Sequence, residues 1–108
     1  MNVGSGGSAP WVIGAGDPSA TLEIVLQKQT VVLSWHQFVC AEGDSEQVRM
    51  AFASHDVVIN GAGLDLLSPA IATHRVVSLR ASVRSERFSA QAARFVNEIV
   101  VRRIESEL

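Results

Sequence analysis

The sequence predicts an α+β fold: a mostly antiparallel sheet of four to six strands, one short helix, and a long C-terminal amphipathic helix packed on one face. Three observations support this prediction. Several segments between residues 21 and 81 are rich in the side chains that favour strands, and some alternate with a period of two. One segment near the C-terminus repeats its apolar residues at helical spacing. A run of strands followed by a covering helix is typical of this class.

The chain has 108 residues, the size of one small domain. Residues 1–10, MNVGSGGSAP, are rich in Gly and Ser, a composition typical of a flexible arm. We therefore expect the single α+β domain to comprise residues 11–108.

The first strands are predicted between residues 21 and 40. In TLEIVLQK, residues 21–28, leucine and isoleucine alternate with residues such as Glu23. In TVVLSWHQFVC, residues 30–40, β-branched and aromatic side chains favour a strand. No strong turn signal stands at Gln29, so one long bent strand and two separate strands are both open.

A hairpin is predicted next. Residues 41–46, AEGDSE, have the polar, Gly-containing composition of a loop. The apolar runs VRMAFA and DVVIN, which cover residues 48–53 and 56–60, are strand-like and are joined by Ser54 and His55.

A short helix and a further strand follow. Residues 64–74, LDLLSPAIATH, are apolar at helical spacing, but Ser68 and Pro69 interrupt it. Proline is favoured in a first helical turn, so we expect Ser68 as an N-cap of one broken helix or two short turns. Residues 75–81, RVVSLRA, predict a strand.

The final helix is predicted from Arg87 to about Glu105. This stretch contains no Gly or Pro, and its apolar residues form one stripe at helical spacing. The stripe consists of Phe88, Ala92, Phe95, Val96, Ile99, Val100 and Ile104.

Two Gly-Ala-Gly segments, WVIGAGD (residues 11–17) and DVVINGAGLDLL (residues 56–67), have the spacing of the first glycines of a dinucleotide-binding turn. That fingerprint needs a third glycine for close packing of helix on strand. Ser19 and Leu66 occupy this place. We interpret the segments as tight turns, with Asn60-Gly61 as a type I′-like bend or strand exit, and predict no cofactor.

Catalytic and metal sites are not predicted, although enzymatic activity is left open. Ser54-His55-Asp56 contains the residue types of a hydrolase triad, but neighbours on a strand point to opposite faces. The possible zinc ligands are His36, Cys40, His55 and His74. Their spacing matches none of the usual close pairs of a zinc site.

The charge distribution suggests one candidate ligand site. The net charge of −2 argues against a nucleic-acid binder. Residues 75–108 carry seven arginines against four acids, however. Arg80, Arg84 and Arg87, together with His74, are candidates for binding an anion. The corresponding alternative function is a small-ligand binding protein or a small enzyme with a pocket near Arg80, Arg84 and His74.

The apolar content favours association instead. Hydrophobic residues make up 47% of the chain, and the 8 glycines bring the apolar fraction to about 54%, against the usual ~45–50%. A small chain of this composition is expected to bury a face against a copy of itself or a protein partner. We therefore predict a non-catalytic, self-associating interaction module, most simply a dimer, with Leu22, Leu33 and Val101 as interface candidates.

The expected location is the cytoplasm. Cys40 is the single cysteine, which fits a reducing compartment. No N-terminal secretory pattern is visible, and no apolar run reaches the ~18 residues that span a bilayer. We expect no membrane partner.

Overall fold

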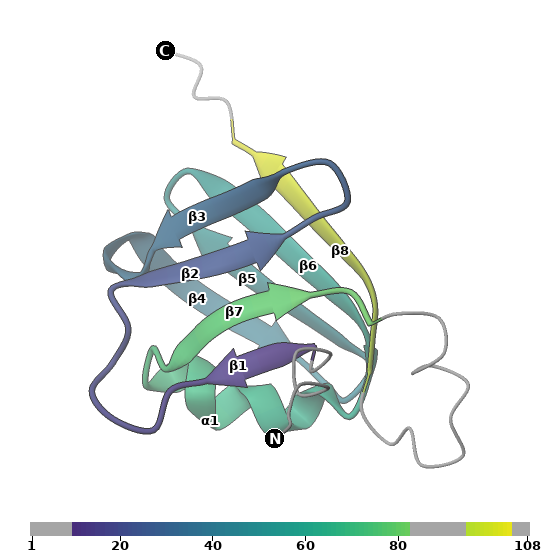
Figure 1. Ribbon diagram of the computed structural model, residues 1–108, viewed down its shortest axis with the longest axis horizontal. Helices are drawn as coiled ribbons and strands as arrows, with labels where there is room; N and C mark the ends of the chain where they lie inside the picture. The colour runs from purple at the N-terminus through teal and green to yellow at the C-terminus, as the bar shows by residue number, and fades with distance from the viewer. Residues whose placement is uncertain (1–9, 83–94, 105–108) are drawn as a thin grey trace, which may run out of the picture.

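The computed structural model describes residues 10–82 and 95–104, which form two four-stranded sheets and a short helix (Figure 1). The elements are β1 (Trp11–Ile13), β2 (Thr21–Val25), β3 (Thr30–Ser34), η2 (Trp35–Gln37), β4 (Phe38–Gly43), β5 (Gln47–Phe52), β6 (His55–Ala62), η3 (Leu64–Leu66), α1 (Leu67–Ala72), β7 (Val76–Arg80) and β8 (Phe95–Arg103). Sheet A has the order β1-β7-β2-β3, and sheet B has the order β4-β5-β6-β8. Within them only the β2–β7 pair is parallel.

The core lies between the inner faces of the two sheets. Alternation sends every second side chain inward, except at the register irregularities of β7 and β8, where two inward residues are three apart. Sheet A contributes Leu22, Ile24, Leu33, Val76 and Leu79, and sheet B contributes Val48, Met50, Phe52, Val57, Ile59 and Val96. One end is covered by α1, whose buried residues are Leu67, Ala70 and Ile71 (Figure 1).

The chain passes from sheet A to sheet B at η2. The β2–β3 hairpin is closed by the Leu26 N–H, which donates to the Gln29 carbonyl at 2.8 Å, so one long bent strand over residues 21–40 is wrong. The single strand expected over residues 30–40 is also wrong, because these residues form β3, η2 and the start of β4. At the end of β3, the Ser34 hydroxyl accepts a hydrogen bond from the His36 N–H and caps η2. Trp35 is buried here, and its Nε1–H donates to the Val76 carbonyl at 3.1 Å.

The predicted C-terminal helix is wrong, because residues 95–103 form strand β8 instead. β8 pairs antiparallel with β6, and Val96, Ile99 and Val101 face inward. A register irregularity between Asn60 and Gly61 places two inward positions three residues apart, a spacing that resembles a helical stripe. The β-branched residues of this segment favour the strand. Residues 87–94 and 105 of the predicted helix lie outside the described residues. The fold is therefore two packed sheets with one short helix.

Gly61 lies within β6, so the type I′-like bend predicted at Asn60-Gly61 is wrong, whereas the alternative of a strand exit misses the end of β6 by one residue. β6 continues to Ala62, and Gly61 is opposite Val96. A Cβ atom at Gly61 would lie 2.0 Å from the backbone oxygen of Phe95. Glycine is therefore required by the close approach of β8, rather than by a positive φ.

The central hairpin and the short helix agree with the sequence. β5 and β6 pair antiparallel, as predicted. The loop predicted for residues 41–46 is wrong at residues 41–43, because these belong to β4, which ends at Gly43 just before the turn that leads to β5. The 64–74 segment forms η3 followed by α1, with Pro69 in the first turn of α1. The N-cap is Leu66 rather than Ser68.

Candidate interaction surfaces

The outer face of sheet A is apolar for a solvent-facing surface. Its exposed large side chains are Val12, Val25 and Val32, which are 48%, 40% and 58% exposed. The register aligns Val12, Ser78, Glu23 and Val32 in one row across the four strands. The only charged residues within these strands are Glu23 and Arg80, and Arg80 lies opposite Val25.

The interface residues expected from the sequence lie elsewhere. Leu22 and Leu33 are 0% and 4% exposed in the core, on the inner face of sheet A. Val101 is half-buried and packs against the core from β8. Next to Leu33, Val32 points outward, because neighbouring residues on a strand face opposite sides.

Two residues of the expected anion site, His74 and Arg80, lie at opposite ends of β7. His74 precedes β7 and Arg80 ends it, so the strand separates them by roughly 15–20 Å at about 3.3 Å per residue. The Arg80 side chain donates from Nη1 to the Ala81 carbonyl at 2.9 Å. Arg84 and Arg87 lie outside the described residues.

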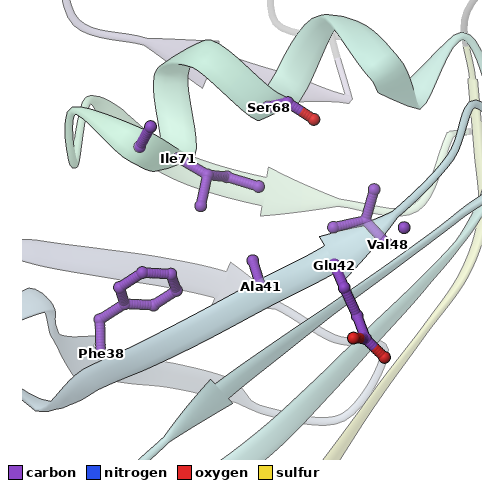
Figure 2. A pocket seen from close by; sticks show the side chains of 8 residues that line it. Phe38, Ala41, Glu42, Val48, Ser68 and Ile71 are labelled. Atoms are coloured by element: carbon purple, nitrogen blue, oxygen red, sulfur yellow. The ribbon is translucent and has the colours of Figure 1, made fainter.

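A groove separates the edge strand β4 from α1. It encloses a cavity of about 220 Å³ that is lined by Phe38, Ala41, Glu42, Gly43, Val48, Ser68, Ile71 and Ala72. Figure 2 shows Ala41 pointing from β4 toward Ile71 of α1, while the Glu42 side chain points away from the helix. The pairing explains this, because Ala41 lies opposite buried Met50 and Glu42 lies opposite exposed Arg49.

Beyond Phe38, a more open cleft of about 490 Å³ continues along the same side of the molecule. It is lined by Pro18, Ser19, Ala20, Trp35, His36, Phe38 and His74. The rings of Trp35 and His74 are stacked, with centroids 4.8 Å apart and planes at 8°. Phe38 meets both rings edge-on, at 5.3 and 5.5 Å. Phe38 is thus shared by the groove and the cleft.

His74 has a left-handed backbone, with φ of 56°. It ends α1 in a Schellman motif: the His74 N–H donates to the Ile71 carbonyl at 3.0 Å and the Arg75 N–H to the Ala70 carbonyl at 2.8 Å. Glycine is usual at this position, and a residue with a Cβ atom is strained there by about 1–2 kcal/mol. Stacking on Trp35 offsets part of this strain and fixes the imidazole at the cleft.

The outer face of sheet B carries facing pairs of polar residues, together with exposed Val100. The register places Glu42 opposite Arg49 and Asp56 opposite Arg102. Gln47 donates from Nε2 to Oδ1 of Asn60 at 2.9 Å. Opposite charges and amide pairs at facing positions are favourable across antiparallel strands.

Ser54 and His55 are in contact, with 2.7 Å between Ser54 Oγ and His55 Nδ1. The Ser54 hydroxyl also lies 3.1 Å from Oε1 of Gln37, to which it donates, and the direction of its contact with His55 depends on the tautomer of the imidazole. Asp56 belongs to the outer face of sheet B, opposite Arg102.

Within residues 10–82 and 95–104, no three His, Cys, Asp or Glu side chains gather in a way that would hold a metal ion. In the same part of the chain, no helix has the length and apolar content to cross a bilayer. Comparisons of the chain with family models, with curated proteins and with solved structures give no match.

Proposed function

We propose that the protein is a non-catalytic interaction module that self-associates through the outer face of sheet A. The observation that supports this proposal is the exposure of Val12, Val25 and Val32 on one face whose strands carry only two charged residues. Exposed apolar patches of this kind are typical of protein interaction sites.

The partner that we propose is a second copy of the chain. In a two-fold dimer the same surface of each protomer meets its copy, so one apolar face covers the other. The strands of this face carry one acid, Glu23, and one base, Arg80, so they have no net charge that would oppose such a contact.

The area of this face determines how tightly two copies are expected to bind. Four strands about 4.8 Å apart, each about five residues long, cover roughly 300 Å² in plan. Stable complexes bury about 800 Å² of accessible surface on each partner. We therefore expect a weak dimer whose population depends on concentration.

The test is the replacement of Val32 by Glu, followed by sedimentation velocity over a range of protein concentrations. The wild type should show a concentration-dependent increase in mass, and Val32→Glu should remain a monomer. Val39→Glu is the matched control, because Val39 is exposed to a similar degree, 65%, but lies on β4 of sheet B.

A wild type that stays monomeric at all concentrations would refute self-association. Dissociation by Val39→Glu with no effect of Val32→Glu would place the contact at β4 and refute the assignment to sheet A. Circular dichroism and thermal melting of both variants would establish that each is folded.

A further inference from the structure

The starting point is the edge of sheet B formed by β4. Among the described residues, this strand pairs only with β5. Free strand edges are commonly blocked by short length, by charge or by bulges. β1 has three residues, and the edge strand β8 carries Glu98, Arg102 and Arg103. The pairing of β4 is irregular between Phe38 and Cys40 but regular from Cys40 to Gly43, where Glu42 is the single charged side chain, so this part of its edge is suited to pair with another strand. The remaining edge strand, β3, carries no charge, and the cavity described next distinguishes β4 from it.

The cavity beside this edge has room for one large apolar side chain. Its volume is about 220 Å³. An apolar cavity of about 150 Å³ is large enough to hold benzene. Ala41 and Ile71 face each other across it (Figure 2), and Val48 contributes a further apolar wall. A leucine or phenylalanine entering from an added strand would be enclosed by β4 and α1.

The charge at one end of the groove favours a basic partner. Glu42, Asp44 and Glu46 are exposed within and just after β4, and Arg49 is the one basic residue opposite them. Hydrogen bonds from the N–H groups of Glu46 and Gln47 hold the Asp44 carboxylate in the turn. Glu42 is therefore the carboxylate best placed to meet a cation on an added strand.

The position of α1 distinguishes a peptide from a second copy. In a symmetric β4–β4 pair, each β4 would enter its partner's groove with its own α1 already beside it. Two helices would then compete for the same space, and the two acidic turns would be brought together. An isolated extended peptide brings neither a second helix nor a second acidic turn, so the groove accommodates a peptide.

We infer that the groove between β4 and α1 binds an extended peptide as an added strand, with one apolar side chain in the cavity and a Lys or Arg beside Glu42. Adjacent residues of a strand point to opposite faces. Ala41 faces the cavity and Glu42 faces outward, so the apolar and basic residues of the peptide must be neighbours. This is recognition by β-augmentation, in which main-chain hydrogen bonds hold the peptide and alternate side chains select it. The inference does not depend on self-association through sheet A.

The probe is the fluorescein-labelled peptide Thr-Val-Lys-Leu-Lys-Val-Thr, which reads the same in both directions and so fits either strand polarity. Binding is followed by fluorescence anisotropy and by amide chemical shifts. The shifts should concentrate at residues 38–43 and 67–72. Replacing both lysines by glutamate, or methylating alternate backbone nitrogens, should weaken binding by at least about tenfold, equivalent to about 1.4 kcal/mol.

Two variants test the groove. Glu42→Lys should weaken binding of the lysine peptide and strengthen binding of the glutamate peptide. The control is Glu98→Lys, which makes the same charge change on β8 and should leave both affinities unchanged. Ala72→Trp should fill the cavity and weaken both peptides, since Ala72 is exposed and lines it. Melting curves of each variant would show that it is folded.

Unchanged binding of the N-methylated peptide would overturn strand addition, and shifts confined to sheet A would overturn the site. Absence of binding up to about 1 mM, where the binding free energy is only about −4 kcal/mol, would overturn the inference altogether. Repeating the titration in Val32→Glu separates the two proposals. If Val32→Glu still binds the peptide, the groove is supported whatever the oligomeric state. If Val32→Glu no longer binds it, peptide binding requires the dimer, and an isolated peptide site is contradicted.

Discussion

The outer faces of the two sheets differ in composition. Both sheets have apolar inner faces, and both have four strands. On sheet B, the outward positions carry facing pairs such as Asp56 and Arg102, which keep the surface hydrated. On sheet A, the outward positions include Val12, Val25 and Val32. Exposed apolar side chains such as Val39 and Val100 also occur on sheet B, so the difference lies in the charged residues, which are frequent in the strands of sheet B and few in those of sheet A.

The largest expected effect is on the free energy of unfolding, when a residue on the inner face of sheet A is compared with its neighbour on the outer face. Leu33→Ala should lower the free energy of unfolding by about 2–5 kcal/mol, because it leaves a cavity in the core. Val32→Ala, one residue earlier on β3, should change it by less than about 0.5 kcal/mol in the monomer. Chemical denaturation at low protein concentration measures both. Equal losses would contradict the assignment of Leu33 to the core and Val32 to the surface.

A smaller effect is expected on the outer face of sheet B. A double-mutant cycle with Asp56→Ala and Arg102→Ala should give a coupling energy of about 0.2–1 kcal/mol, because the two residues are opposite but exposed. The coupling should fall at high salt, since solvent ions screen exposed charges. A coupling that is zero at low salt would mean that these charges serve hydration alone. The same cycle on Glu42 and Arg49 provides an internal comparison.

The smallest effect concerns Asp44, in the turn between β4 and β5. Hydrogen bonds from the backbone N–H groups of Glu46 and Gln47 lower the pKa of its carboxyl below the ordinary 3.8. The stabilisation is therefore present above pH 3.8 and is lost as the pH falls through the lower folded-state pKa. An NMR titration of the Asp44 carboxyl carbon should give a midpoint below 3.8. Asp44→Asn should remove this part of the acid dependence, and an ordinary midpoint would contradict the capping role.

The sequence predicts local features well where one periodicity is unambiguous. Alternation at residues 21–25 marks β2, and the run from Val48 to Asn60 marks the β5–β6 hairpin. It misleads at residues 95–103, because a bulge near Gly61 changes the spacing of inward side chains to one that also fits a helix. Only the pairing with β6 distinguishes the two interpretations.

The interaction surfaces are harder to predict, because they depend on contacts between distant segments. The sequence singled out Leu33 as an apolar residue at the surface, but which face of a strand is buried is decided by the opposite sheet. The groove requires Ala41 and Ile71, thirty residues apart, to face each other. Only His74 could be noticed from the sequence, because it directly follows the predicted short helix, at a position where glycine is usual.

The position of β7 between β1 and β2 has a consequence for the order of folding. Strands β4, β5 and β6 are consecutive in the chain and pair with their neighbours through short turns. The two earlier parts of sheet A, β1 and the β2–β3 hairpin, have no contact within the sheet until residues 76–80 join them. During synthesis, the free edge of β2 must therefore wait for a strand made about fifty residues later. Pairing over such a separation is slow, so we expect β4, β5 and β6 to nucleate, and β7 and β8 to complete sheet A and sheet B later.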